Sequence, residues 1–286
     1  MRTTLPHWRS LLYVPAAREK FVARAHERGA DAIILDLEDS IAPSEKPAAR
    51  AALAAAIPAV ARNGADVTVR INRPMQMAVQ DIAAAVQPGV RALICTKIIG
   101  PDHVQILAEL IAEAEAARGM APGSTGMVVL VEDAAAVLRA ESIARAHPRI
   151  IGLGVGGEDL ATDLGGEATP DTLDLPKRMG LLAARAAGIL PMGFIGTVAG
   201  LSDLEGYRLM LRRSRALGFA CASCVHPSQV AIINEEYGAS AADIARAQRM
   251  VAAFDDALAR GLGAVEFEGQ MIDLPVVERA RRLLRA

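Results

Sequence analysis

The chain of 286 residues is 52% hydrophobic and 22% charged, which supports a large packed core and excludes intrinsic disorder. Aromatic residues make up 3% of the chain and the formal net charge is -2, so we do not expect a nucleic-acid binder. No apolar stretch reaches about 18 residues, and three cysteines without a signal-peptide layout favour a cytoplasmic protein with no membrane partner.

Apolar, β-like runs alternate with helix-like segments along most of the chain. The segments 18–28 and 45–61 are typical of the helical ones, since Ala, Arg and Glu recur there at helix-compatible spacing. Strands that are apolar on both faces and separated by helices predict a parallel sheet covered by helices. The predicted strands are residues 10–15, 32–37, 66–72, 92–98, 127–132, 150–155, 192–196 and 222–226.

This alternation predicts an α/β fold, a (β/α)8 TIM barrel over residues 1–238. Roughly eight strand–helix units are the number that such a barrel needs. A doubly wound open sheet is the alternative, and it predicts fewer strands and one glycine-rich first turn. Gly152-x-Gly154-x-Gly156-Gly157 lies in mid-chain and lacks the G-x-G-x-x-G spacing, so we do not expect a dinucleotide site there.

Residues 239–286 predict a C-terminal extension of helices and a hairpin that a barrel does not need for closure. We expect this extension to pack on a neighbouring subunit or to cap a site. Its predicted elements are a helix over 241–260, a hairpin of 265–267 and 270–272 around Glu268-Gly269, and a helix over 274–285 with Pro275 in its first turn.

Two acids follow successive predicted strands. Glu132 ends the run Gly126-Met-Val-Val-Leu-Val-Glu132, and Asp159 closes the next one at Gly157-Glu-Asp159. Carboxylates at the carboxyl ends of neighbouring parallel strands can converge on one hard cation, typically Mg2+. The sequence therefore predicts a magnesium site and favours an enzyme, although Asp159 alone is also compatible with a helix cap.

Other ionisable residues also lie where predicted strands end, which is where barrel active sites collect. The acids within Asp36-Leu-Glu38-Asp39 are compatible either with ligand binding or with a buried ion-pair network that includes Arg70 or Lys97. Lys97 is also a candidate Schiff-base lysine, as in some barrel aldolases. His226 is compatible with substrate binding or with a packed, hydrogen-bonded imidazole.

These segments together resemble the citrate lyase β-subunit-like family, the acyl-CoA lyases of the HpcH/HpaI aldolase superfamily. The resemblance covers nearly the whole chain, in several independent motifs in the right order. The motifs are Arg9-Ser-Leu-Leu-Tyr-Val-Pro15, Gly29-Ala-Asp-Ala-Ile-Ile-Leu-Asp-Leu-Glu-Asp39, Lys46 with Arg50, Val69-Arg-Ile-Asn72, Glu132, Gly157-Glu-Asp-Leu160 with Asp163-Leu-Gly165, His226-Pro-Ser-Gln229 and Gly269-Gln-Met-Ile-Asp273.

The resemblance implies a TIM barrel that assembles as a homotrimer or a dimer of trimers, with Mg2+ held by Glu132 and Asp159. It implies that Arg70 binds the oxygens of a 2-oxo acid, and that Asp273 is the general acid/base, delivered by an adjacent subunit. The residues that it implies in substrate binding, chiefly of a CoA thioester, are Arg70, Glu132, Tyr13, Lys20, Arg24, Lys46, Arg50, Val225 and His226. Basic side chains among them suit the phosphates of CoA.

The expected activity is Mg2+-dependent cleavage of a short 3-hydroxyacyl-CoA, of the citramalyl-CoA or malyl-CoA type, to an acyl-CoA and pyruvate or glyoxylate. Condensation to a malate and hydrolysis of the thioester use the same enolate. One alternative is a metal-dependent aldolase for free 2-oxo-4-hydroxy acids, and another is a lyase-complex subunit that uses carrier-bound substrate.

The sequence departs from its relatives at three places. It has Thr96-Lys-Ile-Ile99 where Pro-Lys-Val-Glu is common, Glu132-Asp133 where Glu-Thr is usual, and Gly196-Thr-Val-Ala199 instead of Asp-Thr-Val-Tyr. All three lie near the expected mouth of the site. They bear on the acid portion of the substrate and not on the metal pair.

Overall fold

The computed structural model describes residues 5–196 and 203–285. The chain divides into two compact units, Met1–Tyr237 and Gly238–Ala286. Residues 197–199, which belong to one of the departures from the relatives, lie outside the described residues.

The first unit is a barrel of parallel strands in the order β7-β6-β5-β4-β3-β2-β1-β8. A bridge between Met192 and Cys221 joins β7 to β8, and the Gly193 amide donates a hydrogen bond to the Cys221 carbonyl at 2.8 Å. The predicted barrel is therefore confirmed, and the doubly wound alternative is wrong because the two outer strands meet. The strands are β1 (Ser10–Pro15), β2 (Ala32–Asp36), β3 (Asp66–Ile71), β4 (Val90–Cys95), β5 (Gly126–Val131), β6 (Ile150–Val155), β7 (Leu190–Met192) and β8 (Ala222–Cys224).

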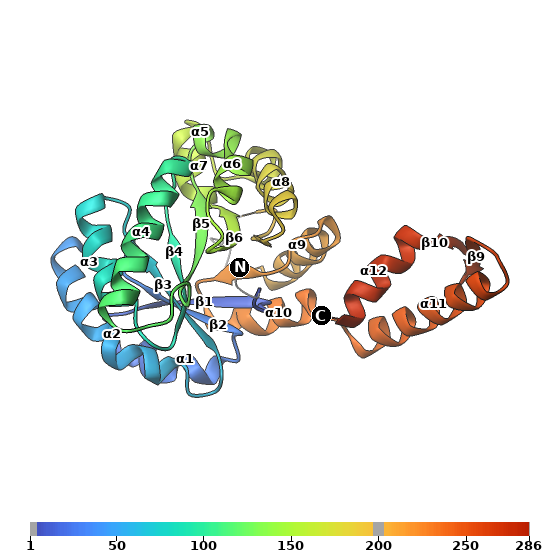
Figure 1. The fold of residues 1–286 in the computed structure, drawn as a ribbon, viewed down its shortest axis with the longest axis horizontal. Helices are drawn as coiled ribbons and strands as arrows, with labels where there is room; N and C mark the ends of the chain where they lie inside the picture. Colours follow the sequence, from blue (N-terminus) through green and yellow to red (C-terminus); the bar gives the residue numbers. More distant parts are fainter. Residues whose placement is uncertain (1–4, 197–202, 286) are drawn as a thin grey trace. The chain divides into compact units, whose positions relative to one another are not determined.

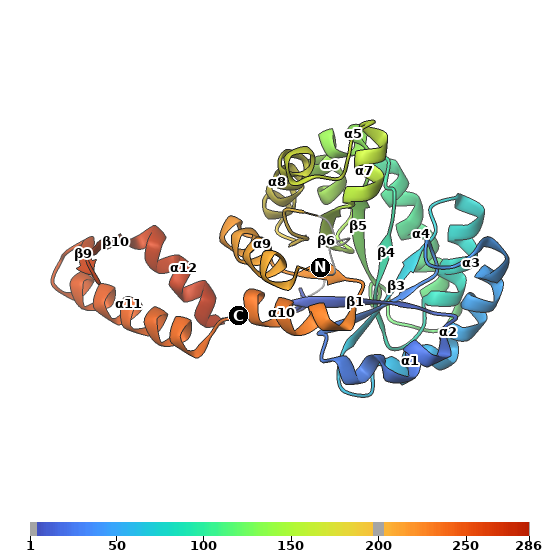
Figure 2. The same ribbon diagram turned by 180° about the vertical axis from the view of Figure 1, so that it is seen from behind.

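Helices surround these strands in the first unit (Figures 1 and 2). The predicted segments 18–28 and 45–61 are helical, with short 3-10 turns at His26–Arg28 and Pro43–Glu45. The helices are α1 (Glu19–Ala25), α2 (Lys46–Val60), α3 (Met75–Ala85), α4 (Pro101–Ala117), α5 (Ala134–Leu138), α6 (Ala140–Arg145), α7 (Gly157–Asp163), α8 (Pro170–Ala187), α9 (Leu204–Leu217) and α10 (Pro227–Tyr237).

Apolar side chains alternate along each strand between two cores. On β2, Ile34 packs inside the barrel, whereas its neighbours Ile33 and Leu35 pack against the helices. Both faces are buried, which is why the strands read as continuous apolar runs. Cys221 and Cys224 are free and buried, and they pack in different cores, because residues three apart on a strand face opposite sides.

Three strand predictions extend at least two residues too far toward the mouth of the barrel. The run 92–98 forms a strand only as far as Cys95, before the left-handed Lys97 with a φ of 51°, and the other two concern β7 and β8. The run 192–196 forms a strand only as far as Met192, and the run 222–226 only as far as Cys224. After β7, Gly193 and Gly196 have φ values of 124° and 142°, which bend the chain out of the sheet. After β8, α10 begins at Pro227 and leaves no room for further strand pairing.

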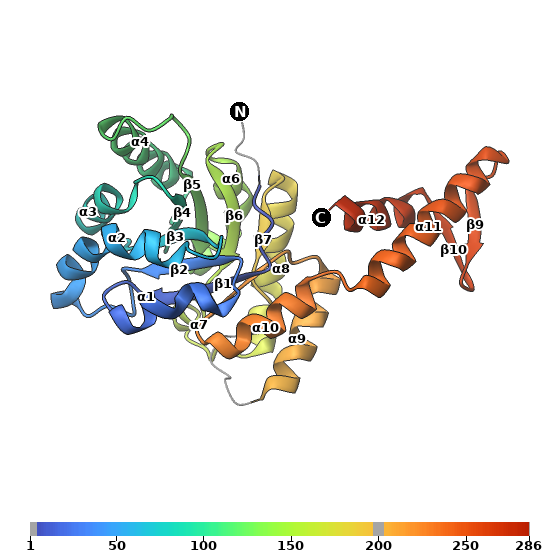
Figure 3. The ribbon, with the colours of Figure 1, turned by 90° about the horizontal axis from the view of Figure 1, so that it is seen from below.

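The second unit contains α11 (Ala241–Ala259), the antiparallel hairpin of β9 (Ala264–Phe267) and β10 (Gln270–Asp273), and α12 (Leu274–Arg285). Ser240 and Asp243 form a capping box at the start of α11. Glu268 and Gly269 make the hairpin turn with φ values of 51° and 76°. Figure 3 shows α12 beside α11, and Phe254, Ile272 and Val277 are buried between these elements.

Among the described residues, we find no helix with the length and apolar character that crossing a membrane requires.

Candidate active site

A cavity of about 400 Å3 opens at the carboxyl ends of the barrel strands. Residues that the sequence analysis placed at strand ends line it together, although they come from six different strand–loop junctions. They are Tyr13, Asp36, Arg70, Glu132, Asp159 and Val225. The apolar floor comes from inward-facing strand residues such as Ile34, Ile94 and Val128. The cavity therefore combines an apolar body with charged groups on one side, as small-molecule sites do.

Glu132 directly follows β5, and its side chain is buried. The backbone amide of Lys97 donates a hydrogen bond of 2.6 Å to Glu132 Oε2. A Cβ on Gly156 would collide with the Glu132 carboxylate, so that position needs glycine. Burial, and then the negative charges of Asp159 and Glu38, raise the pKa of Glu132 to about 7.

Asp159 lies in the first turn of α7, at the carboxyl end of β6, and is half-exposed to the cavity. Its charge bears on Glu132 strongly enough to raise the pKa of that residue. Among the described residues no three His, Cys, Asp or Glu side chains are grouped to hold a metal, so this pair would be the whole protein contribution. Mg2+ is often bound by one or two carboxylates, with waters or substrate oxygens completing the shell. The hard oxygen donors and their negative charge, which Lys97 compensates only in part, therefore fit Mg2+.

Arg70, on β3, is held rigidly in the wall of the cavity. It donates to both carboxylate oxygens of Asp36 at 2.7 Å, and its Nη1 lies 2.9 Å from Glu38 Oε2. The guanidinium stacks 4.7 Å from the centre of the Tyr13 ring. Burial is the largest single influence and lowers the pKa of Arg70, but the hydrogen bonds with Asp36 and the neighbouring charges of Tyr13, Asp36 and Glu38 together raise it. A fixed, permanently charged fork suits the oxygens of a carboxylate or carbonyl group.

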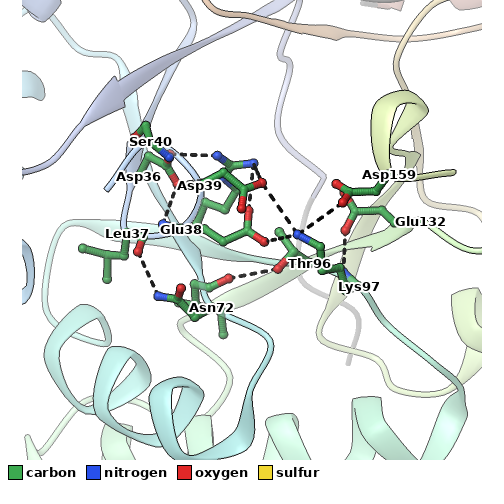
Figure 4. A network of polar contacts seen from close by, with 12 residues as sticks. Asp36, Leu37, Glu38, Asp39, Ser40, Asn72, Thr96, Lys97, Glu132 and Asp159 are labelled. Carbon is green, nitrogen blue, oxygen red and sulfur yellow. Dashed lines mark hydrogen bonds and ion pairs between the residues drawn. The ribbon is translucent and has the colours of Figure 1, made fainter. Parts of the chain in front are cut away.

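Lys97 connects this network with the two acids (Figure 4). Its Nζ lies 2.6 Å from Glu38 Oε1 and 3.6 Å from an oxygen of Asp159. Burial is the largest single influence and lowers the pKa of Lys97, but the hydrogen bond to Glu38 and the charges of Glu38, Glu132 and Asp39 together raise it. A Schiff-base lysine needs a neutral amine, so this alternative for Lys97 is not supported. The predicted ion-pair network is present, because Asp36 and Glu38 both pair with Arg70.

Lys46 and Arg50, which the family resemblance implies in substrate binding, are engaged in contacts that α2 makes with the ends of β2 and β3 and with α3. Lys46 Nζ is buried and donates to the carbonyls of Leu37 and Glu38 at 3.0 Å and to Asn72 Oδ1 at 2.6 Å. Arg50 pairs with the fully buried Asp81 at 2.9 Å. These contacts hold the loop after β2 in place, so neither charge is available to a ligand in this arrangement.

The remaining residues implied in substrate binding are exposed. Lys20 and Arg24 lie on α1, and Val225 and His226 follow β8. The imidazole of His226 bonds through Nδ1 with the Ser228 hydroxyl at 2.7 Å, and its exposure rules out the packed-core alternative.

Asp273 lies in the second unit, exposed at the end of β10, where Oδ1 accepts from the Val276 amide at 3.4 Å.

The sequence analysis missed one charged group of the cavity. Lys177, on α8, lines the cavity but is buried, with 6% of its surface exposed. The periodicity of α8 contains a signal for it, since Leu173, Gly180 and Ala184 are also buried and lie four, three and seven residues away. A lysine on the buried face of an amphipathic helix needs a polar partner in the interior.

Comparison with known proteins identifies relatives along almost the whole chain. The family described as HpcH/HpaI aldolase/citrate lyase matches residues 9–227. The citrate lyase subunit beta of Leuconostoc mesenteroides subsp. cremoris is 34% identical over 282 residues, which are 97% of this chain and 92% of that protein. The (3S)-malyl-CoA thioesterase of Cereibacter sphaeroides is 32% identical over 280 residues, covering 97% of this chain and 93% of the relative. The crystal structure of CitE from Mycobacterium tuberculosis in complex with magnesium, acetoacetate and coenzyme A has a TM-score of 0.76 and 31% identity, with 96% of each chain covered.

Proposed function

This chain belongs to the HpcH/HpaI aldolase/citrate lyase family, and on that premise we propose that it is a Mg2+-dependent carbon–carbon lyase. Its substrate would be a short 3-hydroxyacyl-CoA of the citramalyl-CoA or malyl-CoA type, and its products an acyl-CoA and pyruvate or glyoxylate. The observation that carries this proposal is the pair of Glu132 and Asp159 in one cavity with Arg70. The pair fits a hard cation, and the guanidinium fits an anionic oxygen beside it.

Relatives support both halves of the proposed substrate. The CitE structure from Mycobacterium tuberculosis contains magnesium, acetoacetate and coenzyme A, and another structure of the same protein contains magnesium and pyruvate. The Cereibacter sphaeroides relative acts on (3S)-malyl-CoA. An apolar cavity with charged groups at one end matches an acid that carries a thioester on the other side.

The reaction breaks the bond between the carbons that carry the thioester carbonyl and the hydroxyl group. The hydroxyl group gives its proton to a general base, for which Asp273 is the candidate, and becomes the carbonyl group of the 2-oxo acid, while the electron pair of the broken bond forms the thioester enolate. Bound Mg2+ would polarise the oxygen that becomes the ketone. Arg70, fixed by Asp36, would orient the carboxylate of the 2-oxo acid portion and stabilise the charge that develops on its oxygens.

The enolate must then receive a proton on carbon to give the acyl-CoA. We assign this proton to Asp273, supplied by the second unit of an adjacent subunit in a homotrimer. Its carboxylate is exposed and makes one weak hydrogen bond within the described part of the chain, so little opposes its movement onto a substrate. Lys20, Arg24 and His226 would contact CoA from the rim, whereas Lys46 and Arg50 would act by holding the loop after β2.

Thioester hydrolysis is a second candidate, favoured by the malyl-CoA thioesterase relative. It would use the same cavity, with water attacking the thioester carbonyl and free CoA leaving. The two activities differ in their products: a lyase releases a 2-oxo acid and keeps the thioester, whereas a thioesterase releases the hydroxy acid and a free thiol.

The test is an assay of the purified full chain with citramalyl-CoA and malyl-CoA, with and without a chelator. A 2-oxo acid product that disappears on chelation supports the lyase. Free thiol without a 2-oxo acid supports the thioesterase. No product from either thioester contradicts both, and activity on free 2-oxo-4-hydroxy acids or on carrier-bound substrate would then identify one of the alternative functions.

A further inference from the structure

Residues 193–196, here called the exit segment, follow β7 without continuing the sheet. Gly193 and Phe194 of this segment line the cavity. Because the segment leaves the sheet, most of its backbone polar groups cannot be satisfied by strand pairing and need other partners.

Side chains of three helices provide these partners. Lys177 of α8 donates to the carbonyl of Phe194 at 2.9 Å and also to the carbonyl of Gly196. Ser214 of α9 accepts from the amide of Ile195 at 2.9 Å. Tyr237 of α10 donates to the carbonyl of Gly193 at 2.7 Å. The exit segment is thus a part of the cavity wall that is held in place by hydrogen bonds from side chains and not by pairing with a neighbouring strand.

Lys177 is central in this arrangement, since it alone binds two of the carbonyls. Its Nζ also lies 5.0 Å from the centre of the Phe194 ring. No carboxylate among the described residues forms an ion pair with Lys177. Its ammonium group donates hydrogen bonds to backbone carbonyls instead. Burial lowers the pKa of Lys177 to about 8, with Glu158 acting in the opposite direction. Loss of a proton would still leave two N–H donors for the two carbonyls.

We propose that Lys177 is a positioning residue that fixes the exit segment as a wall of the cavity and thereby determines which acyl substrate is accepted. The inference that it sets specificity rests on the lyase function proposed above, whereas the inference that it fixes the segment does not. A buried carbonyl without a donor is costly, so removal of the ammonium group should release residues 194–196 from their present path.

The first measurement is amide hydrogen exchange of the full chain, which needs no activity. Lys177→Met keeps the length of the side chain and removes its donors, and we expect exchange of the Ile195 amide to become at least about tenfold faster. Lys177→Arg keeps a donor and should restore much of the protection. Arg178→Met changes the next residue of α8, which pairs with Asp174, and should leave the segment unaffected. Unchanged exchange in folded Lys177→Met would refute the positioning role.

The second measurement is the ratio of kcat/KM between citramalyl-CoA and malyl-CoA, which differ by one methyl group. We expect Lys177→Met to reduce the preference of the wild type by about fivefold or more, since a methyl group in a tight pocket is worth about 10- to 200-fold. Arg178→Met should retain the preference. Faster exchange with an unchanged ratio would refute the specificity role. If the wild type cleaves neither substrate, the lyase proposal fails, while the exchange data still decide whether Lys177 fixes the segment.

Gly196→Ala provides an independent perturbation if Lys177→Met does not fold. Its φ of 142° disfavours alanine, and the new Cβ would collide with Met210 Sδ, so the segment must shift while Lys177 remains. This variant should reproduce both effects of Lys177→Met. Wild-type exchange and wild-type preference in folded Gly196→Ala would contradict the proposal.

Discussion

Protonation of Glu132 is expected to control Mg2+ binding below pH 7. Burial and the nearby charges of Asp159 and Glu38 raise the pKa of Glu132 from 4.5 to about 7. Mg2+ binds the ionised carboxylate, so the metal and the proton compete for the same oxygens. A cation between the two acids would also cancel the repulsion that contributes to the raised pKa.

The size of the effect follows from this pKa. Each pH unit below 7 should weaken the apparent Mg2+ affinity by about tenfold, so the loss from pH 8 to pH 6 is about tenfold. A carboxyl group with the ordinary value of 4.5 would remain ionised over this range, and the affinity would change by only about 3%. The two cases are therefore clearly distinguishable.

The same shift affects the stability of the metal-free protein. Between pH 4.5 and about 7 the folded protein keeps a proton on Glu132 that the unfolded chain has already lost. Stability without Mg2+ should therefore fall as the pH rises through this window, by about 3 kcal/mol in total, and no further above it. Added Mg2+ should oppose this fall by binding the folded state.

Isothermal titration of Mg2+ from pH 5.5 to 8.5, together with urea unfolding of the metal-free protein, measures both effects. Glu132→Gln should bind Mg2+ poorly and lose the fall in stability between pH 4.5 and 7. Glu158→Gln removes another acid of the same cavity and should keep the steep pH dependence. An affinity that stays constant from pH 6 to pH 8 in the wild type would show that Glu132 is not the titrating metal ligand.

Three further outcomes are expected. Asp159→Asn should reduce turnover by at least about a thousandfold without unfolding the chain, and activity that survives both this change and a chelator would contradict the metal site. Mixed oligomers of inactive Arg70→Ala and Asp273→Ala subunits should regain part of the activity, and an absence of rescue in verified mixtures would argue against a shared site. Arg149→Met should destabilise the barrel by about 3–5 kcal/mol in chemical denaturation, since it leaves buried Glu115 without its partner at 2.7 Å. An effect below about 1 kcal/mol would show that this ion pair is dispensable.

The sequence predicts the barrel and the metal pair for one physical reason. Parallel strands covered on both faces must be apolar throughout, so an ionisable residue marks the point where a strand ends. Glu132 and Asp159 follow β5 and β6, which are hydrogen-bonded neighbours, and their proximity follows from strand order. The same reasoning predicts Arg70 as a residue of the site. Arg70 lies at the end of β3, directly opposite Asp36 in the pairing of β2 with β3.

The features that the sequence does not predict depend on tertiary contacts. Such contacts leave no periodic pattern of residue types in the sequence. Lys46 has the charge of a phosphate-binding residue, but its ammonium group is buried against three acceptors, two just after β2 and one just after β3. The segment after β7 is hydrogen-bonded by Lys177, which precedes that strand on α8. The left-handed backbone of Lys97, with a φ of 51°, is not expected for a lysine, and it directs the amide to Glu132.

The distribution of charge at the mouth of the cavity explains why a cation should bind at Glu132 and Asp159. Arg70 and Lys97 both lie within ion-pair distance of Glu38, so the two basic groups are held on that side of the cavity. Lys97 Nζ reaches Asp159 only at 3.6 Å, and Glu132 receives a backbone amide but no ammonium or guanidinium within 4 Å among the described residues. Negative charge on the pair is therefore only partly compensated, and after burial it is the next cause of the raised pKa of Glu132. A divalent cation would remove the imbalance and would place a Lewis acid beside the fixed guanidinium of Arg70, which is the arrangement that the proposed cleavage requires.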